Sequence, residues 1–257
     1  MQFIKKILKN AYIYDSLQRF RAQKVLRKWT AHDQEMLEFY SKFVSRGALC
    51  FDIGANIGNR AKIFLKLQAN VIAVEPQEEC VKMLRTEYEG NPNITIVQKA
   101  VGEAEGEAEL IISDASTISS LSPEWIESVR RSGRFSEYHW DKKQIVQITT
   151  LDKLIDQYGT PSFIKIDVEG FEYQVVKGLS KPIKMLSLEF TPEFIESTFK
   201  CIDHLQGLGA ISLNYSINES MYLALEKWVT PEKIVKILSS FRNDNNLFGD
   251  VYVQFLT

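Results

Sequence analysis

Short apolar runs alternate with stretches of helical periodicity along most of the chain from residue 48 onwards. The apolar runs predict buried strands, and the periodic stretches predict amphipathic helices. Regular alternation of this kind implies right-handed crossover connections and a parallel sheet with helices on both faces. The predicted strands cover 48–53, 71–75, 94–98, 163–167 and 185–190, and the predicted helices cover 59–68, 77–88, 151–158, 171–178 and 193–207.

The alternation is interrupted in the middle of the chain. Short strands are predicted at 107–113 and 144–149, and the polar stretch of residues 114–143 between them contains a short helix at 123–131. Connections of this length are uncommon in compact domains and often form a lid or a substrate loop, so we interpret 114–143 as a candidate lid. Two late strands, near 210–216 and 251–256, predict an antiparallel C-terminal edge of the sheet.

The first 47 residues differ from the rest and predict an N-terminal helical extension to a domain of residues 48–257. Residues 1–29 form a basic amphipathic pattern with three interpretations: a helix packed on the domain, a docking surface for an anionic substrate or partner, or a membrane-surface helix. A second helix is predicted to begin with Asp33 as its N-cap and to end near Gly47.

Composition places the chain among ordinary soluble globular proteins. It has 257 residues, 45% of them hydrophobic and 25% charged, with a net charge of −2, which argues against a nucleic-acid partner. No apolar run is long enough to span a membrane, and Lys5-Lys6 interrupts the start of any signal-peptide core. Three cysteines without CxxC spacing predict reduced, buried thiols, and we expect a cytoplasmic protein.

A glycine-containing loop follows the first predicted strand, in the segment FDIGANIGN at residues 51–59. Gly54 and Gly58 let the backbone turn from strand to helix close to a ligand, and Glu75, twenty-one residues after Gly54, ends the next strand where it can reach a ribose diol. The GxxxG spacing lacks the GxGxxG pyrophosphate fingerprint, so a ligand with a ribose but no diphosphate fits better, with S-adenosylmethionine as the leading candidate. The candidate cofactor-binding residues here are Asp52, Gly54, Ala55, Asn56, Gly58, Asn59, Glu75 and Pro76.

Acidic residues end further predicted strands, at the sheet edge where α/β proteins bind their ligands. Lys165 and Asp167 alternate with apolar residues in a central strand, and burying both is costly unless they are paired with each other or used by the protein. We assign Asp167 as a catalytic base or acceptor-orienting group that also faces the cofactor, with Glu169 beside it and Glu189 in reserve. The same three carboxylates can hold Mg²⁺ on a substrate diol, but they need no metal to be satisfied, and we predict none.

The chain contains five motifs in the order FDIGANIGN, VIAVEP, KAVGEAEGEAEL, TTLDKL and KIDVEGFE. Together they resemble the FkbM family of S-adenosylmethionine-dependent methyltransferases. The resemblance covers about residues 48–190, and its most specific part is KIDVEGFE. It implies a Rossmann-like, class I methyltransferase domain of seven strands that methylates hydroxyls of sugars, glycans or secondary metabolites. Many class I enzymes have an aspartate after the third strand, where this chain has Gln98-Lys99-Ala100, so Ala100 is expected to contact the cofactor through backbone or apolar atoms.

Two other functions remain open at this point. A nicotinamide-dependent oxidoreductase on the same topology is disfavoured by the missing GxGxxG pattern. A non-catalytic domain that binds a partner through the basic N-terminal segment is disfavoured by the retained loop glycines, Glu75 and Asp167. The sequence leaves the small-molecule or glycan acceptor and the oligomeric state undetermined.

Overall fold

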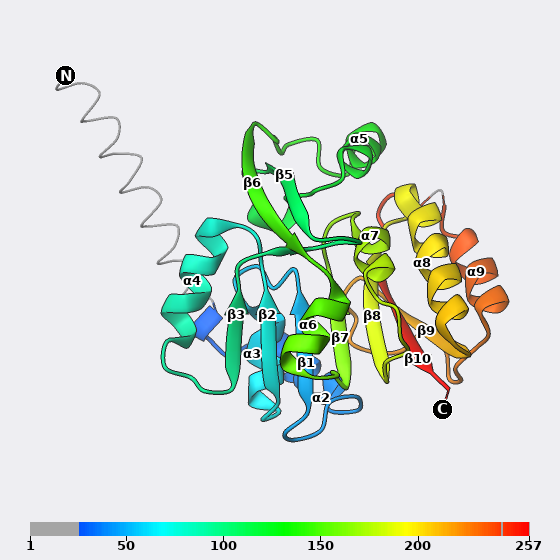
Figure 1. Ribbon diagram of the computed structural model, residues 1–257. Coiled ribbons are helices and arrows are strands. Elements are labelled where there is room, and N and C mark those ends of the chain that lie inside the picture. The colour runs from blue at the N-terminus through cyan, green and yellow to red at the C-terminus, as the bar shows by residue number, and fades with distance from the viewer. Residues whose placement is uncertain (1–25, 243, 257) are drawn as a thin grey trace.

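The computed structural model of the protein describes residues 26–242 and 244–256 (Figure 1). The basic helix predicted over residues 1–29 lies, as far as residue 25, outside the described residues. Across the two described ranges, no helix combines the length and the apolar character needed to cross a membrane.

A seven-stranded sheet forms the centre of the molecule, in the order β3-β2-β1-β7-β8-β10-β9 (Figure 1). Its strands are parallel except for β10, which runs antiparallel to both of its neighbours, β8 and β9. The predicted parallel sheet with an antiparallel C-terminal edge is therefore confirmed. The strands are β1 (Leu49–Ile53), β2 (Asn70–Val74), β3 (Ile94–Val97), β7 (Phe163–Ile166), β8 (Met185–Phe190), β9 (Ile211–Ile217) and β10 (Gly249–Phe255).

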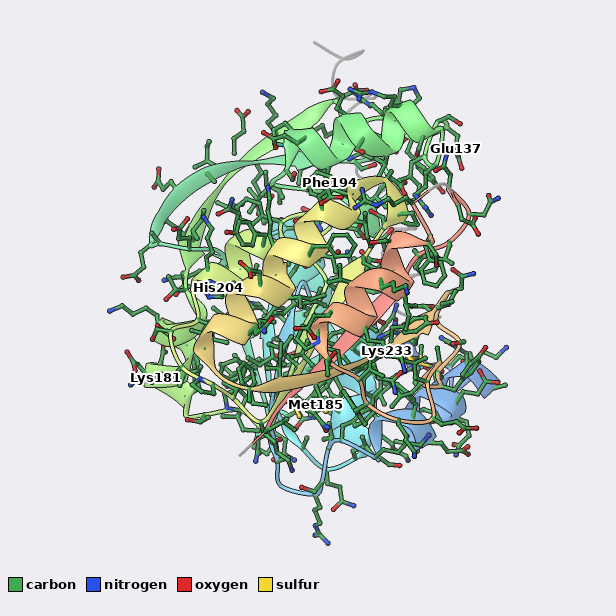
Figure 2. The ribbon with its side chains drawn as sticks, turned by 90° about the vertical axis from the view of Figure 1, so that its right-hand side faces the viewer. Glu137, Lys181, Met185, Phe194, His204 and Lys233 are labelled. Carbon is green, nitrogen blue, oxygen red and sulfur yellow. The ribbon has the colours of Figure 1, made fainter. Side chains whose placement is uncertain are left out.

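Helices cover both faces of this sheet because alternate residues of the buried strands carry apolar side chains to each face. On one face α6 (Leu151–Tyr158), α7 (Glu172–Lys177), α8 (Ile195–Leu208) and α9 (Pro231–Ser239) pack on the larger core. Figure 2 shows α8 and α9 side by side, with Phe194 at the start of α8 and His204 towards its end. The sequence pattern did not predict α9. On the opposite face lie α2 (Ala31–Tyr40), α3 (Asn59–Lys66) and α4 (Glu78–Tyr88).

The start of α2 differs from the prediction. Thr30, not Asp33, is the N-cap, and its hydroxyl accepts a hydrogen bond from the Asp33 backbone N–H. The Asp33 carboxylate in turn accepts from the Thr30 backbone, so the two residues form a capping box. Asp33 was mistaken for the cap because both residue types are favoured there, and the pair occupies the first and last positions of the motif.

A second sheet of three strands, in the order β4-β6-β5, rises above the carboxyl edge of the central sheet (Figure 1). It consists of β4 (Ala100–Val101), β5 (Gly106–Ile112) and β6 (Lys142–Thr149), and β5 pairs antiparallel with β6. The candidate lid of residues 114–143 connects β5 to β6 and contains α5 (Pro123–Ser132). The lid has a hydrophobic cluster of its own around Trp125 and Trp140.

The three cysteines, Cys50, Cys80 and Cys201, are buried free thiols, as predicted. Burial raises the pKa of each thiol, which keeps it protonated and unreactive.

Candidate functional site

The predicted glycine loop joins β1 to α3 at the carboxyl edge of the sheet. Gly54 has φ +81° and donates its N–H to Val74 O at 2.9 Å, and a Cβ atom there would lie 1.8 Å from Asp167 O. Gly58 has φ +99° at the N-cap of α3, and a Cβ atom there would lie 2.9 Å from Leu84. Both positions therefore require glycine, for backbone conformation and for space.

Glu75 holds this loop in place. Its carboxylate accepts one hydrogen bond from the Asn56 backbone N–H at 2.8 Å and another from the Gln77 backbone N–H at 2.7 Å. The side chain is only 2% exposed, and burial raises its pKa to about 7, against the effect of these hydrogen bonds. Because each carboxylate oxygen accepts more than one hydrogen bond, Glu75 retains capacity for a ligand's hydroxyl groups.

Asp52, in β1, lies beneath the same loop. Burial raises its pKa to about 6, while Arg60 and Lys165 act in the opposite direction. The backbone N–H of Ala61, in the first turn of α3, also favours the charged form of Asp52. Its Oδ2 atom is buried and has no hydrogen-bond partner among the described residues. Such an oxygen in a cavity wall suits a ligand's cationic group.

Lys165 is 1% exposed in the middle of the sheet and forms two ion pairs. Its Nζ atom lies 3.1 Å from Oδ2 of Asp167 and 2.8 Å from Oδ1 of Asp250. The expectation that a buried lysine must be paired or used is met by this pairing. The lysine thereby fixes the orientation of the Asp167 carboxylate at the exit of β7.

Asp167, Glu169 and Glu189 lie together, and each offers an oxygen within 4.8 Å of the others. Burial first, and then the neighbouring carboxylates, raise the pKa of Glu169 and of Glu189 well above the ordinary value. Glu169 has φ +53°, an uncommon backbone conformation for a residue other than glycine. Three close carboxylates of this kind can share protons, and their hard oxygens also suit a divalent cation.

One pocket of about 230 Å³ collects almost all of the predicted site residues. Gly58 is the exception, because it packs against Leu84 and Tyr88 instead. The predicted residues that line the pocket are Asp52, Gly54, Ala55, Asn56, Asn59, Glu75, Pro76, Ala100, Asp167, Glu169 and Glu189.

The pocket also contains residues that sequence reasoning missed. Arg60 pairs with Glu219 at 2.5 Å, and its buried Nε atom has no hydrogen-bond partner among the described residues. Glu219 belongs to a loop after β9 that carries no motif, so only the fold brings it here. Leu110 of β5 and Phe171 add apolar surface. Ser116 also lines the pocket and accepts a hydrogen bond from the Asn56 side chain at 3.3 Å.

Two other polar candidates in the lid lie away from the pocket. Arg134 is buried against Glu193. No local pattern indicates this pairing, because the two residues lie on separate elements. His139 is exposed, and its Nδ1 atom lies 3.7 Å from Oδ2 of Asp114 at the surface.

The fold and the pocket define an α/β domain with a cavity at the carboxyl edge of its parallel sheet, where domains of this class bind their ligands. A glycine loop, a carboxylate at the end of the adjacent strand and an acidic group beyond it lie around one cavity. The Methyltransferase FkbM domain matches residues 52–215, which is most of the chain. The chain belongs to the FkbM family of S-adenosylmethionine-dependent methyltransferases, as the sequence motifs indicated.

Individual relatives are distant. The hexuronic acid methyltransferase AglP of Haloferax volcanii is 22% identical over 175 residues, covering 66% of this chain and 67% of AglP. An O-methyltransferase from Bacillus cereus, solved in complex with SAH, is 10% identical with a TM-score of 0.46, covering 95% of this chain and 91% of that one. A precorrin-6y C5,15-methyltransferase from Geobacter metallireducens is 10% identical with a TM-score of 0.45, covering 86% and 87%. At these scores neither structure bears on the substrate.

Proposed function

We propose that the protein transfers the methyl group of S-adenosylmethionine to a hydroxyl of a sugar, a glycan or a related small molecule. The observation that carries the proposal is the position of Asp167, Glu169 and Glu189 in the same pocket as the glycine loop and Glu75. A relative whose name describes methylation of a hexuronic acid supports a carbohydrate acceptor.

In this proposal different residues of the pocket contact different parts of the cofactor. Glu75 accepts hydrogen bonds from the ribose hydroxyls while it holds the loop through Asn56 and Gln77. Asp52 offers its free Oδ2 to the cationic amino group. Ala100, Val101 and Leu110 supply an apolar surface for the adenine ring.

When bound, S-adenosylmethionine supplies an already activated methyl group, so the protein has to position the acceptor oxygen and take up its proton. Lys165 orients Asp167 towards the pocket, where Asp167 acts as the base or aligns the hydroxyl. Glu169 and Glu189 lie within reach as further proton acceptors. Burial and the neighbouring carboxylates raise the pKa of both glutamates well above the ordinary value, which favours proton uptake by this group of carboxylates.

A nicotinamide cofactor fits the site less well. The loop between β1 and α3 lacks the second, closely spaced glycine that allows a pyrophosphate to approach the backbone.

The proposal is tested by measuring SAH release with S-adenosylmethionine and a panel of oligosaccharides, including ones that contain hexuronic acids. We expect a hydroxyl-bearing sugar to be methylated, and Asp167→Asn to slow transfer by about 10²- to 10⁴-fold while SAH still binds. Asp156→Asn, which makes the same change on an exposed face of α6, is the matched control and should keep the wild-type rate. Methylation of amines alone, or a fully active Asp167→Asn variant, would contradict the proposal.

A further inference from the structure

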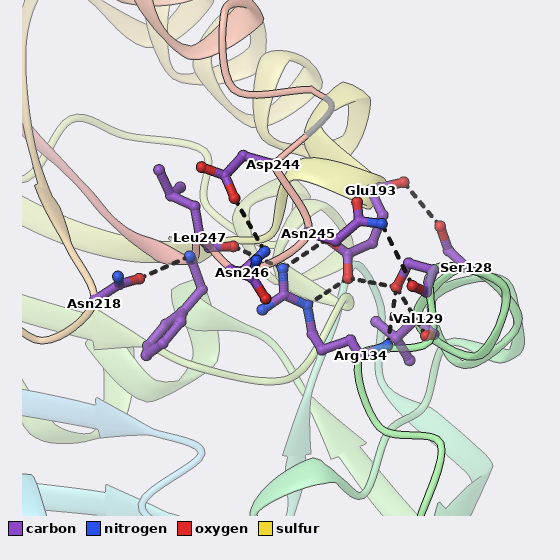
Figure 3. Close-up of polar contacts among 11 residues, drawn as sticks. Ser128, Val129, Arg134, Glu193, Asn218, Asp244, Asn245, Asn246 and Leu247 are labelled. Atoms are coloured by element: carbon purple, nitrogen blue, oxygen red, sulfur yellow. Dashed lines mark hydrogen bonds and ion pairs between the residues drawn. The ribbon is translucent and has the colours of Figure 1, made fainter.

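Arg134 forms a buried, two-pronged ion pair with Glu193 beyond the C-terminal end of α5 (Figure 3). Its Nε lies 2.5 Å from Oε1 of Glu193, and one terminal nitrogen lies 3.0 Å from Oε2. That nitrogen also donates to Leu247 O at 2.7 Å. The side chains of Arg134 and Glu193 are 9% and 7% exposed. Arginine suits this position because its rigid fork serves a carboxylate and a carbonyl at once.

Further hydrogen bonds join the same elements. Ser128 donates to Glu193 O at 2.8 Å, and Ser132 donates to Oε1 of Glu193 at 3.2 Å. Asn245 donates to Ser132 O at 3.4 Å. The end of α5 is therefore tied both to the short 3-10 turn η2 (Pro192–Phe194) before α8 and to residues 244–247 before β10 (Figure 3).

One of these connections leads to a wall of the cofactor pocket that we name the seryl wall, residues 116–121. Ser116, Thr117, Ser119 and Leu121 line the pocket, and Ser122, the next residue, is the N-cap of α5. At its other end the wall contacts the loops after β1 and β2, because Asn56 donates to Ser116 Oγ at 3.3 Å and Gln77 donates to Ser116 O at 3.0 Å. The wall therefore continues directly into α5, and Ser120 also joins it to Ile111 of β5 and to Glu169 O.

The second connection leads to another part of the pocket lining, which we name the Glu219 wall, residues 218–219. Phe248 follows Leu247, and its N–H donates to Oδ1 of Asn218 at 3.1 Å (Figure 3). Glu219, the next residue, lines the pocket and pairs with Arg60. Both residues of this wall have positive φ, so the loop needs outside contacts to keep its shape.

We propose that Arg134 is a positioning residue: by binding Glu193 and Leu247 O, it fixes the seryl wall and the Glu219 wall relative to each other and gives the cofactor pocket its binding shape. The inference rests on the proposed function in naming S-adenosylmethionine as the ligand. The inference goes beyond the proposed function because it assigns an effect on cofactor affinity to Arg134, a residue that does not line the pocket.

Arg131, in the last turn of α5 and three residues before Arg134, provides a matched control. It pairs with Glu127 one turn away, and these side chains are 76% and 71% exposed. An exposed pair within one helix joins no other element and contributes little. Arg131→Met thus removes the same charge as Arg134→Met without touching either wall.

The experiment measures amide hydrogen exchange and SAH affinity by calorimetry on the full chain. In Arg134→Met we expect the amides of both walls to exchange about tenfold faster and SAH affinity to fall about tenfold, within the usual range of coupling between sites. Arg134→Lys, which keeps the charge but loses the fork, should recover part of the affinity. Arg131→Met should match the wild type.

If Arg134→Met does not fold, Glu193→Gln provides the same comparison with one charge removed and the shape kept. A folded variant in which the amide hydrogen exchange of both walls and the SAH affinity are unchanged would overturn the proposal. Faster amide exchange in α5 alone would also overturn it. If the wild type itself does not bind SAH, the proposed function fails, and the exchange of the two walls alone then decides on the positioning role.

Discussion

The Nζ atom of Lys165 lies 2.8 Å from the Oδ1 atom of Asp250, although their strands, β7 and β10, are not neighbours. The lysine crosses above β8, where its backbone partner Ser187 carries only a short side chain. A third group, Asp167, completes the arrangement at 3.1 Å. The proposed methyl-transfer carboxylate is thus anchored to the antiparallel C-terminal strand.

Replacing Lys165 by methionine should destabilise the protein by about 3–5 kcal/mol, because the buried Asp250 carboxylate loses its counter-charge and the partly exposed Asp167 loses its partner. Urea unfolding measures the change. Lys153→Met, at an exposed lysine 4.0 Å from Glu105, serves as the control and should stay within about 0.5 kcal/mol of the wild type. A loss below about 1 kcal/mol for Lys165→Met would mean that the ion pairs contribute little.

Glu172 should make stability depend on pH. Burial raises its pKa from 4.5 to about 7, so between these values the folded protein keeps a proton that the unfolded chain releases. The associated stability is complete below about pH 4.5 and is lost as pH rises towards 7, by about 3 kcal/mol at most.

Glu172→Gln tests this dependence with little disturbance, because one oxygen, Oε1, accepts both the Val168 and the Gly170 N–H groups and an amide oxygen can do the same. Relative to the wild type, the variant should gain stability between pH 5 and pH 7.5 in urea titrations. Parallel curves for the two proteins would show that Glu172 is charged throughout this range. Glu75 and Asp52 act in the same direction and are common to both proteins.

Gly54→Ala should destabilise the protein by well over about 1 kcal/mol, because the new Cβ would meet Asp167 O at 1.8 Å in a left-handed conformation. Thermal and urea unfolding measure the loss. Gly207→Ala, in α8 with no atom within 4 Å of the new Cβ, should instead stabilise by about 0.5–1 kcal/mol. Equal effects at the two positions would contradict the assigned role of the loop.

Proton sharing and a bound cation make opposite predictions for Asp167, Glu169 and Glu189. With Asp167 paired to Lys165 and the pKa values of both glutamates raised, we predict that EDTA leaves SAH release unchanged and that Mg²⁺ leaves the melting temperature unchanged. Loss of activity in EDTA that Mg²⁺ restores, together with a higher melting temperature in Mg²⁺, would instead assign the three carboxylates to a metal.

The sequence allowed us to predict the elements that are marked by a local pattern of residues. The alternation of apolar runs and helical periods gave the parallel sheet, and motif spacing brought Glu75 and Asp167 to one edge. Pairings between distant segments were missed, because β5 and β6 meet across the lid and periodicity says nothing about partners. Helix α9 was missed although Thr230 and Pro231 mark its start, as expected for an N-cap and a first helical residue.

The candidate site shows the same division. Residues inside motifs were identified. Arg60 and Glu219 were missed because they are 159 residues apart in the chain, and only the fold brings them together. Length and polarity delimited the segment of residues 114–143 in the sequence, and its function as a lid stays a prediction. Its attachment through Arg134 and Glu193 depends on three segments that only the fold brings together.

The most direct test of the central claim is calorimetric titration of the ligand-free protein with S-adenosylmethionine, SAH and NAD⁺, repeated on Glu75→Ala. We predict that the two adenosyl compounds bind and that NAD⁺ does not. In Glu75→Ala their affinity should fall by about ten- to a hundredfold, as expected for the loss of charge-assisted hydrogen bonds worth about 1.5–3 kcal/mol. Binding of NAD⁺ alone, or full affinity for SAH without Glu75, would contradict the account.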